Sequence, residues 1–397
     1  MSVHGLGSDD PRSFDLILVG GGLQNGLISL ASLHQDPARS IAVIEAGDTI
    51  GGNHTWSLHA EDVPAAARPF IDELLVARFD SYDVRFPGFS RTVAAPYSVI
   101  SSDRFAEVVE RRLRRSPSCE LLLGTVANTV EPNGVKLRDG RVLRADVVID
   151  ARGPGTARPG QRAGYQKFLG RELRTREPHG LRRPVLMDAT VPQNDGFRFF
   201  YVLPLAPDRL LVEDTTFSRS PLLNLETARA AIDTYAADWG PFVECVREES
   251  GVLPMPWANG HEIDRASPLR AGYAGGFFHP ATGYSLPVAL RLAMHVATHT
   301  SDDMFEAEFS ELVQRHKRQA RYAQELNRLL FHCFAPEEMW NVFARFYTLP
   351  EAMLARFYSL SLTRWDQARI LLGRPPRGFS LSHAFSLSHA LTASRLS

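Results

Sequence analysis

The chain has 397 residues, and its 44 Lys and Arg residues nearly balance its 45 Asp and Glu residues, which gives a formal net charge of −1 with histidine neutral. At roughly 100–200 residues per domain this length predicts two or three structural units, and a content of 44% apolar and 22% charged residues excludes a disordered chain. The balanced charge offers no cationic field for nucleic acid, so no nucleic acid partner is expected.

The cysteines and the N-terminus favour a cytoplasmic protein. The three cysteines lie far apart and form neither a metal-ligand spacing nor a disulfide framework: Cys119, Cys245 and Cys333. The first 14 residues contain two acids and no apolar core, so we do not expect a signal peptide. No metal site is predicted.

Two windows of 20 residues, 16–35 and 271–290, carry no charged side chain and have the length of a membrane span. The first contains four glycines, and the second contains four glycines and two prolines. Because an irregular backbone is poorly tolerated in lipid, we interpret both windows as strand–turn–helix units.

The first window predicts a nucleotide-binding turn. Residues 15–19 form a continuous apolar run typical of a strand buried on both faces, and a glycine turn, a helical stretch and a second apolar run at 41–44 follow. Gly20 would allow the tight turn, and Gly22 would let a pyrophosphate approach the helix N-terminus. Glu45, after the second run, stands where a carboxylate binds ribose hydroxyls.

This glycine fingerprint is imperfect, because Asn25 occupies the third glycine position and Gly26 follows one place later. The close contact between helix and strand must therefore be made in another way. A purely structural glycine turn is the alternative. Both strands and the acid are in register, however, which favours a dinucleotide site with Asn25 and Gly26 among its candidate residues.

Two further glycine features favour FAD over NAD as the dinucleotide. Gly51 and Gly52 closely follow the expected ribose acid, as in FAD proteins whose backbone passes near the cofactor. Residues 144–153 read as a hairpin arm that runs into a buried strand and ends at Gly153, which resembles the returning strand of flavoproteins of the glutathione-reductase type. His54 has no partner set for a metal and is interpreted as a local hydrogen-bonding group.

Residues 155–265 change character and predict a β-rich unit. The stretch 158–183 is rich in Arg, Gly and Pro and is expected to be a loop. Residues 197–203 and 209–217 read as strands joined by a turn at 204–208. We expect an antiparallel hairpin that forms the floor of a substrate cavity.

Two adjacent acids, Glu213 and Asp214, interrupt the second of these strands. Because strand side chains alternate, the two acids cannot share a face. The alternation groups Glu213 with Leu211 and Thr215, and Asp214 with Leu210, Val212 and Thr216. Catalysis is one interpretation of these acids. The other is that they face solvent or pair with arginine, which is abundant because only three of the 44 cationic residues are lysine.

The C-terminal third begins with a second glycine-rich turn, 269–285, before a helix expected at about 287–298. Its backbone N–H groups could bind an anion or the polar edge of a flavin, with Gly283 and Tyr284 as candidate contacts. Residues 303–375 show helical periodicity with aromatic anchors.

A repeat of Ala-Arg-Phe-Tyr at 344–347 and 355–358 spans 11 residues, or three helical turns, so both aromatic pairs are expected on one helix face. Core packing is one interpretation of this face, and contact with a membrane surface is the other. The tail 378–397, which repeats Phe-Ser-Leu-Ser-His-Ala, is expected to be poorly ordered.

A set of motifs occurs in order between about residues 14 and 377. They are Asp-Leu-Ile-Leu-Val-Gly-Gly-Gly-Leu-Gln-Asn-Gly-Leu-Ile at 15–28, Gly-Gly-Asn-His-Thr-Trp at 51–56, Val-Glu-Asp-Thr at 212–215, His-Pro-Ala-Thr-Gly-Tyr-Ser at 279–285, Pro-Glu-Glu at 336–338, and the run at 345–351. Together they resemble the bacterial lycopene beta-cyclases of carotenoid synthesis. The Asn25-Gly26 departure is itself typical of that family.

The resemblance implies a flavoprotein that converts lycopene through gamma-carotene to beta-carotene without net redox change. It also implies FAD in its reduced form, with NAD(P)H as the electron source. The Glu of the Val-Glu-Asp-Thr motif, Glu213, is implied as the acid/base, with Asp214 beside it.

The implied fold is α/β. A Rossmann-type FAD-binding domain of the glutathione-reductase type would occupy 14–154 and return at 266–300. A β-rich substrate domain would occupy 155–265, a C-terminal helical region 301–377, and the tail 378–397.

A substrate as apolar as lycopene resides in the bilayer, so we expect a cytoplasmic enzyme associated peripherally with the inner membrane. Five aromatic residues could stabilise a carbocation in the cavity by cation–π interaction: Phe199, Tyr201, Phe217, Trp257 and Phe277. Two alternative functions stay open. One is a flavin-dependent monooxygenase or oxidase acting on an apolar isoprenoid, and the other is a non-catalytic carrier of apolar lipid that uses FAD structurally.

Overall fold

The apolar runs near the N-terminus form the centre of a mainly parallel sheet. The structure, a computed structural model, describes residues 13–153, 162–258, 263–372 and 375–380. Across this first sheet the described strands are, in order, β8 (Glu120–Leu122), β2 (Ile41–Ile44), β1 (Ser13–Val19), β11 (Val142–Asp150), β10 (Gly134–Leu137) and β9 (Ala127–Glu131), with β17 (Leu269–Arg270) paired to β11. Strand β10 pairs antiparallel with both β11 and β9, and all other pairs in this sheet are parallel.

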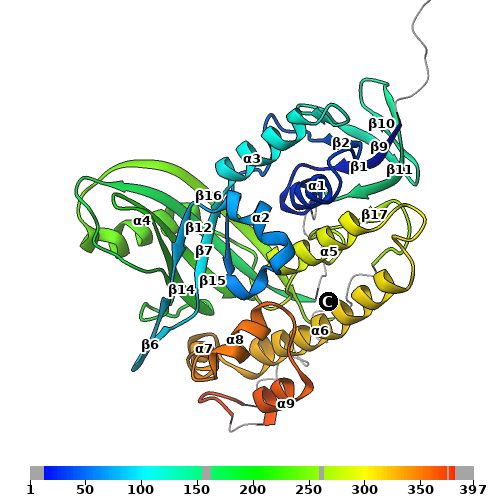
Figure 1. The fold of residues 1–397 in the computed structure, drawn as a ribbon. Coiled ribbons are helices and arrows are strands. Elements are labelled where there is room, and N and C mark those ends of the chain that lie inside the picture. The colour runs from blue at the N-terminus through cyan, green and yellow to red at the C-terminus, as the bar shows by residue number, and fades with distance from the viewer. Residues whose placement is uncertain (1–12, 154–161, 259–262, 373–374, 381–397) are drawn as a thin grey trace, which may run out of the picture.

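Both faces of β1 are buried, which explains its continuous apolar sequence. Leu16 and Leu18 belong to the core shared with the helices, whereas Ile17 and Val19 belong to the core shared with β9 and β10. The helices of this unit are α1 (Leu23–Gln35), α2 (Arg68–Ile71), α3 (Ser102–Arg115) and α5 (Leu286–Thr298). Helices α1 and α5 lie side by side (Figure 1), so the two uncharged windows of the sequence meet in space.

A second sheet contains the expected hairpin. Its described strands are, in order, β16 (Phe242–Pro256), β12 (Ala163–Thr175), β15 (Arg209–Ser218), β14 (Phe197–Ala206), β13 (Val185–Asp188), β5 (Tyr82–Phe86) and β6 (Phe89–Val93). Strands β14 and β15 are antiparallel, as predicted. Helix α4 (Leu225–Ala236) covers the outer face of the sheet.

The expectation of a loop at 158–183 is wrong for residues 163–175, because β12 is a central strand paired on both edges with β15 and β16. Residues 176–183 form neither helix nor strand, as expected, and residues 158–161 lie outside the described residues. The charged residues of β12 lie on both faces of the sheet and pair with residues of other elements; Glu172, for example, pairs with Arg209 on β15 and Arg247 on β16. Arg171 pairs with Glu248 and Asp233, and Arg174 pairs with Glu244. The Arg-rich composition hid the strand because these charges are neutralised by tertiary neighbours rather than by water.

The second sheet also takes two strands from the N-terminal third of the chain, since β5 pairs in parallel with β13 and β6 pairs with β5. A third, small sheet links the two large ones. It contains β3 (Thr55–His59), β7 (Tyr97–Ser101) and β4 (Ala77–Phe79), with β7 between the other two.

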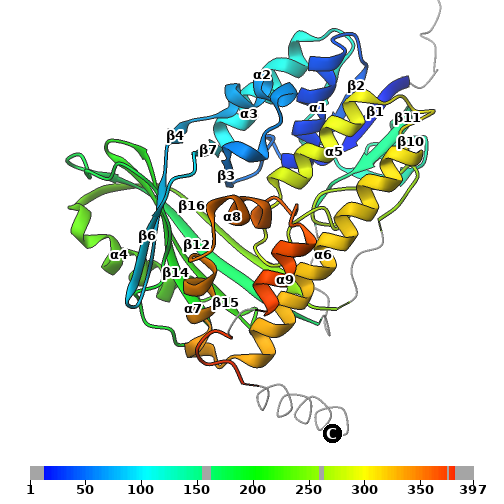
Figure 2. The ribbon, with the colours of Figure 1, turned by 60° about the horizontal axis from the view of Figure 1, so that its bottom comes forward.

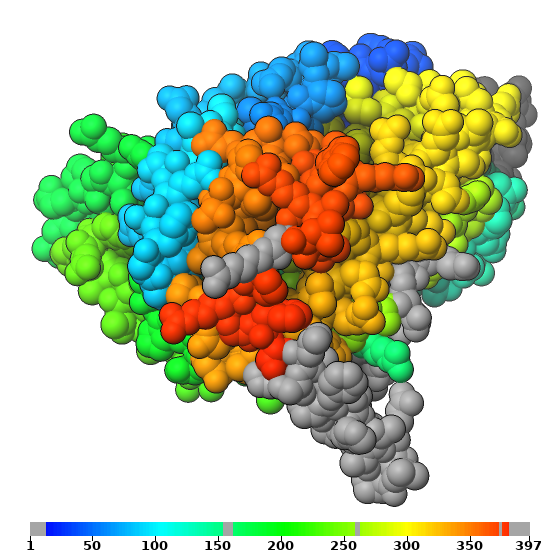
Figure 3. Space-filling model, turned by 90° about the horizontal axis from the view of Figure 1, so that it is seen from below, coloured from blue at the N-terminus to red at the C-terminus, as the bar shows by residue number. Residues whose placement is uncertain are grey.

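The C-terminal helices close the space between the two large sheets. They are α6 (Ala307–Cys333), α7 (Trp340–Phe346), α8 (Glu351–Tyr358) and α9 (Arg364–Leu372). In Figure 2, α8 and α9 lie between the second sheet and the long helix α6, and Figure 3 shows residues of these helices, in orange and red, occupying the middle of that face. Short 3-10 turns complete the described helical elements: Ala60–Asp62, Ala65–Ala67, Asp72–Leu74, Ala237–Trp239 and Pro336–Glu338.

The two copies of the Ala-Arg-Phe-Tyr repeat were expected on one helix face, but they belong to two different helices. The first copy ends α7 and the second ends α8. Pro350 precedes α8 and cannot continue a helix, because proline lacks the backbone N–H and disfavours a helical residue before it. Within the described residues, no helix combines the length and apolarity required to cross a membrane. The tail expected to be poorly ordered, apart from residues 378–380, lies outside the described residues.

Candidate active site

The turn between β1 and α1 is built as an anion cradle. Gly20 adopts φ +94°, and a Cβ atom there would lie 2.8 Å from the Ala151 carbonyl oxygen, so only glycine fits. Gly22 is the N-cap of α1 and makes no side-chain cap. No described atom lies within 4 Å of a Cβ built on Gly22, so the backbone faces open space there. The first-turn N–H groups of a helix lack intrahelical partners and favour an anion.

Glu45 supports this cradle from the end of β2. Its Oε2 accepts a hydrogen bond from the Gly21 N–H at 2.6 Å, and its Oε1 accepts one from the Gly47 N–H at 2.7 Å. The carboxylate thus joins the glycine turn to the following loop. A carboxylate oxygen has two lone pairs, so a ribose hydroxyl could still bind there.

The irregular fingerprint is explained by Asn25 and Gly26. The Asn25 Nδ2 donates to the carbonyl oxygens of Val19 and Gly20 at 2.9 and 2.8 Å, which ties the helix to the strand. Gly26 packs against the ring of Phe105 on α3, and a Cβ there would lie 2.2 Å from Cζ. The close approach expected of the third glycine is therefore made one residue later, and toward α3 rather than β1.

The remaining candidate glycines also occur at sharp turns near the cradle. Gly51, Gly52 and Gly153 all have positive φ, and the Gly51 N–H donates to the Gly21 carbonyl at 2.9 Å. Gly283 is confined by the Tyr273 hydroxyl, which donates to its carbonyl at 2.6 Å.

A cavity of about 790 Å³ extends from this cradle to the second sheet. Its lining includes residues of both uncharged windows, among them Gly22, Gln24, Gly283 and Tyr284, and it also includes Gly51. The Gln24 amide donates to the Ala289 carbonyl at 3.0 Å, while its Oε1 is buried without a hydrogen-bond partner among the described residues. An open helix N-terminus beside an unpaired amide oxygen fits a dinucleotide that carries both phosphate and ring donors.

Glu213 faces this cavity from β15. Its side chain is half-buried and lines the cavity wall, and Thr215 Oγ1 donates to its Oε1. Tyr201 is its directly paired neighbour on β14. Burial, followed by the charge of Glu249, raises the pKa of the Glu213 carboxyl to about 8, so this acid keeps its proton at neutral pH.

Asp214 points to the other face of the sheet, as strand alternation predicted. It is buried there and forms a bidentate ion pair with Arg198, with both N–O distances at 2.8 Å. Asp214, predicted beside Glu213 as a member of the catalytic pair, thus lies outside the cavity lining and is paired with Arg198.

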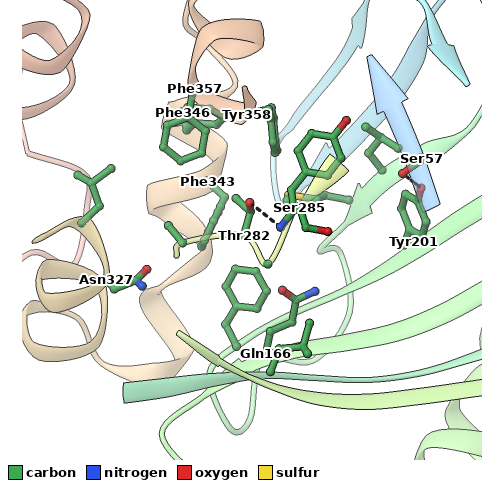
Figure 4. Close-up of a pocket in the computed structure, with 18 of the residues that line it drawn as sticks. Ser57, Gln166, Tyr201, Thr282, Ser285, Asn327, Phe343, Phe346, Phe357 and Tyr358 are labelled. Atoms are coloured by element: carbon green, nitrogen blue, oxygen red, sulfur yellow. Dashed lines mark hydrogen bonds between the residues drawn. The ribbon is translucent and has the colours of Figure 1, made fainter. Parts of the chain in front are cut away.

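Three hydroxyl groups cluster beside Glu213. The Tyr97 and Tyr201 hydroxyls donate to Ser57 Oγ at 2.5 and 3.0 Å and lie 3.0 Å from each other. Figure 4 shows Ser57 and Tyr201 at one side of the cavity. Burial raises the pKa of Tyr97 to about 12 and raises that of Tyr201 well above its ordinary value of 10, so both phenols stay neutral.

Tyr284 belongs to a second buried polar group. Its hydroxyl donates to Asp62 Oδ2 at 2.5 Å, and the His59 N–H donates to the same oxygen at 3.0 Å. Burial raises the pKa of Asp62 to about 6 and lowers the pKa of His59 to about 4. Tyr284 is thus held by its hydroxyl while its ring lines the cavity.

The aromatic lining agrees in part with the prediction. Four of the five predicted rings line the cavity: Phe199, Tyr201, Phe217 and Phe277. The fifth, Trp257, packs against Phe331 and His332 instead. His54, expected to be a local hydrogen-bonding group, lines the cavity and stacks near Trp56.

Other aromatic residues of the lining come from α7 and α8 and were not assigned to the cavity from the sequence. They are Phe343, Phe346, Tyr347, Phe357 and Tyr358, of which four are labelled in Figure 4. The two tyrosines of the repeat meet here, with their hydroxyls 2.7 Å apart. His279 Nε2 lies 3.0 Å from the Phe357 carbonyl and anchors α8 over the cavity. The repeat was the only sequence signal for this wall.

Among the described residues, one group has the composition of a metal site: His295, His299 and Glu308. It lies where α5 ends and α6 begins, outside the cavity lining. The His299 and Glu308 side chains form a hydrogen-bonded contact of 3.1 Å, and the two imidazoles stack 4.0 Å apart. We assign no metal-dependent role to this group.

Comparison with known proteins identifies relatives along nearly the whole chain. A family profile described as Lycopene cyclase protein matches residues 15–384. The lycopene beta-cyclase of Pseudescherichia vulneris is 40% identical over 369 residues, which cover 91% of this chain and 94% of that protein. The lycopene beta-cyclase of Pantoea ananas is 41% identical, covering 91% and 95%, and that of a Paracoccus species is 35% identical, covering 91% and 94%.

Solved structures share the fold at low sequence identity. A geranylgeranyl bacteriochlorophyll reductase-like protein from Thermoplasma acidophilum superposes with a TM-score of 0.61 at 14% identity, covering 95% of this chain and 99% of that chain. A flavin-dependent brominase superposes with a TM-score of 0.63 at 12% identity, covering 97% and 100%. A probable FAD-dependent monooxygenase from Pseudomonas aeruginosa has a TM-score of 0.54 at 16% identity, covering 91% and 100%.

Proposed function

The chain belongs to the lycopene cyclase family, and we propose that it converts lycopene through gamma-carotene to beta-carotene. The observation that carries this proposal is the position of a carboxyl group, Glu213, in the wall of a largely aromatic cavity, where burial raises its pKa to about 8. An isomerisation of an alkene needs a strong proton donor that stays neutral until the substrate arrives. Glu213 meets that requirement.

In the proposed reaction, ring closure is an isomerisation in which one proton is added and one is lost. Glu213 transfers its proton to C2 of the terminal alkene, which leaves a tertiary cation at C1. The electrons of the C5=C6 double bond close the ring onto C1, and a proton leaves C6. The Glu213 carboxylate formed in the first step can accept that proton, so acid and base are one group and no electron is gained or lost.

We further propose that FAD occupies the cradle. Gly20, Gly22 and the first turn of α1 would hold its pyrophosphate, and Glu45 its ribose. Gly51, Gly52 and Gly153 would let the backbone pass close to the cofactor, while Gly283 and Tyr284 would contact the flavin end. When bound in its reduced form, with electrons from NAD(P)H, FAD supplies a fixed negative charge near the cation.

The aromatic wall completes the proposed site. Rings from the sheet and from α7 and α8 line the same cavity as Glu213, and this apolar lining would keep out water, which could otherwise trap the cation as an alcohol. Each ring face directed at the cation would contribute roughly 0.5–2 kcal/mol of cation–π stabilisation. The Ser57, Tyr97 and Tyr201 hydroxyls remain neutral and offer no competing nucleophilic anion.

The membrane is proposed as the source of the substrate, with the enzyme in the cytoplasm at the inner membrane. Helix α9 exposes Trp365 and Leu372 at 86% and 85%, and its Leu371 also lines the cavity. Exposed Arg364 and Arg369 on the same helix would attract anionic lipid head groups. Exposed apolar side chains beside the cavity, flanked by arginines, are the features expected of a surface that binds to a membrane.

One assay separates this function from its rivals. Lycopene in micelles is incubated anaerobically with the enzyme, reduced FAD and D2O. A cyclase yields beta-carotene that carries deuterium at ring C2 and no added oxygen. A monooxygenase or oxidase needs oxygen, and a carrier returns unchanged lycopene. Unlabelled beta-carotene would contradict protonation by Glu213, whose proton exchanges with solvent.

A further inference from the structure

A second carboxyl group lies next to Glu213 in the cavity wall. Gly170 on β12 pairs with Glu213 on β15 at one edge and with Glu249 on β16 at the other. Directly paired residues on antiparallel strands project to the same face of a sheet. Glu213 and Glu249 therefore share the cavity face with only a glycine between them, and both line the cavity.

The glycine lets the Glu249 side chain lie over β12. A Cβ atom on Gly170 would be 3.0 Å from Cγ and 3.3 Å from Oε1 of Glu249, and 3.4 Å from Cδ1 of Leu211 on β15. The Glu249 side chain thus lies above the space that any other residue at 170 would fill. An alanine there would push Glu249 away from its present position.

The two carboxyl groups have opposite partners. Oε2 of Glu249 lies 2.9 Å from the Arg247 guanidinium and accepts a hydrogen bond from Thr55 Oγ1 at 3.2 Å. Glu249 is buried, and the Arg247 guanidinium supplies the cation beside it. For Glu213, the contact within the described residues is the Thr215 hydroxyl, and no ion pair to it is found there.

Resting on the proposed function, we propose that Glu249 is a positioning residue: placed beside Glu213 across Gly170 and paired with Arg247, it keeps the proton on Glu213 between turnovers. A negative charge close to a carboxyl group disfavours the loss of that group's proton. The charge of Glu249 is the largest cause, after burial, of the raised pKa of Glu213.

The other groups that face Glu213 do not titrate in the relevant range. Tyr97 from β7 and Tyr201 from β14 have raised pKa values and remain neutral below pH 10. Ser57 from β3 does not ionise. Asp214 is on the opposite face of β15, paired with Arg198. After burial, Glu249 is therefore the main charged influence on the pKa of Glu213.

The test is the pH dependence of cyclisation in Glu249→Gln, measured anaerobically with the holoenzyme, reduced FAD and saturating lycopene in micelles. Activity requires protonated Glu213 and so falls as pH rises through its pKa. Without the Glu249 charge that pKa is lower, and we expect the alkaline fall to move down by on the order of one pH unit. On that limb the variant would be about tenfold slower, whereas its rate at the acidic plateau stays near the wild-type rate.

Glu248→Gln is the matched control, because Glu248 is the adjacent acid on β16 but points to the outer face, where it pairs with Arg171 and Arg229. Its alkaline limb should coincide with that of the wild type. Glu249→Asp keeps the charge and should retain most of the wild-type profile. Gly170→Ala keeps every charge but displaces Glu249, so its limb should also move to lower pH.

If the activity of Glu249→Gln falls at the same alkaline pH as that of the wild type, or if its rate is reduced equally at every pH, the proposed role of Glu249 is wrong. If Glu249→Gln does not bind FAD or fold, Gly170→Ala decides the question by the same criterion. Failure of the wild type to form beta-carotene would instead refute the proposed function, so the two failures are distinguishable.

Discussion

The raised pKa of Glu213 predicts that replacing this acid with glutamine stabilises the protein while it removes activity. The folded pKa is about 8, against an ordinary value of 4.5. Between these two pH values the unfolded chain ionises Glu213 and the folded protein does not. Folding must then take up a proton, so the wild type loses stability as pH rises from 4.5 to 8.

The magnitude follows from the two pKa values. Keeping Glu213 neutral in the folded protein reduces the free energy of unfolding by less than about 1 kcal/mol at pH 5 and by roughly 3 kcal/mol at pH 7. Above pH 9 the reduction levels off at about 5 kcal/mol. Glu213→Gln removes this reduction because glutamine does not ionise. Its amide oxygen can still accept the Thr215 hydroxyl, so the gain is reduced by at most about 1 kcal/mol.

The assay is urea unfolding of the wild type and Glu213→Gln at pH 5, 7 and 9, with the same saturating FAD in each sample. The free energy of unfolding of the variant should exceed that of the wild type by an amount that grows with pH. Glu248→Gln is again the control. Its hydrogen bond to Arg229 lowers the pKa of Glu248, so this variant should lose stability at neutral pH.

A stability difference that does not change with pH would refute the burial of a neutral acid at Glu213. So would a variant that is less stable than the wild type at pH 9. In the cyclisation assay, Glu213→Gln should lose beta-carotene formation entirely while the flavin stays bound. Substantial residual product would remove Glu213 from its proposed role as the proton donor.

Three further variants test other parts of the structure. Asp214→Asn leaves the Arg198 guanidinium without its carboxylate and should reduce the free energy of unfolding by roughly 2–4 kcal/mol, measured in urea, with the alkaline limb of activity unchanged. Gly26→Ala places a methyl group where the Phe105 ring lies and should reduce the free energy of unfolding by roughly 1–3 kcal/mol. Replacing both Trp365 and Leu372 with serine should lower binding to anionic vesicles at least about tenfold in a flotation assay, while activity on micellar lycopene persists.

The last two of these variants each have a matched control. Gly22→Ala adds a methyl group to open space, so it should retain stability but bind less FAD by absorbance. Loss of stability equal to that of Gly26→Ala would contradict the open cradle. Leu222→Ser alters a residue that is 79% exposed, far from α9 in the sequence. Vesicle binding reduced equally by this change would exclude α9 as the specific contact.

Much of the nucleotide cradle could be predicted from the sequence because its determinants are local. Gly20, Gly22 and Glu45 lie within one strand–turn–helix–strand unit, where short-range backbone geometry decides the structure. The exception was the packing of Gly26. Its partner is Phe105 on α3, about 80 residues later in the chain, and no local pattern identifies such a contact.

The β12 strand and the aromatic wall were less accessible to prediction. The arginines of 158–183 resembled a loop because their acidic partners lie on other elements, such as Glu248 on β16. The repeated Ala-Arg-Phe-Tyr was placed on one helix because its spacing fits three turns. Pro350 divides that helix, and the hydroxyls of Tyr347 and Tyr358 meet only because α7 and α8 fold over the same cavity.

The sequence by itself determined that Glu213 and Asp214 face opposite sides of one strand, because alternation of side chains is a property of the strand alone. It could not determine which side is the cavity or which residues stand beside the acid. Only the pairing of β15, β12 and β16 brings Glu249 next to Glu213 across Gly170. Register between strands that are distant in the chain depends on the whole sheet, and it is this register that places the two carboxyl groups side by side.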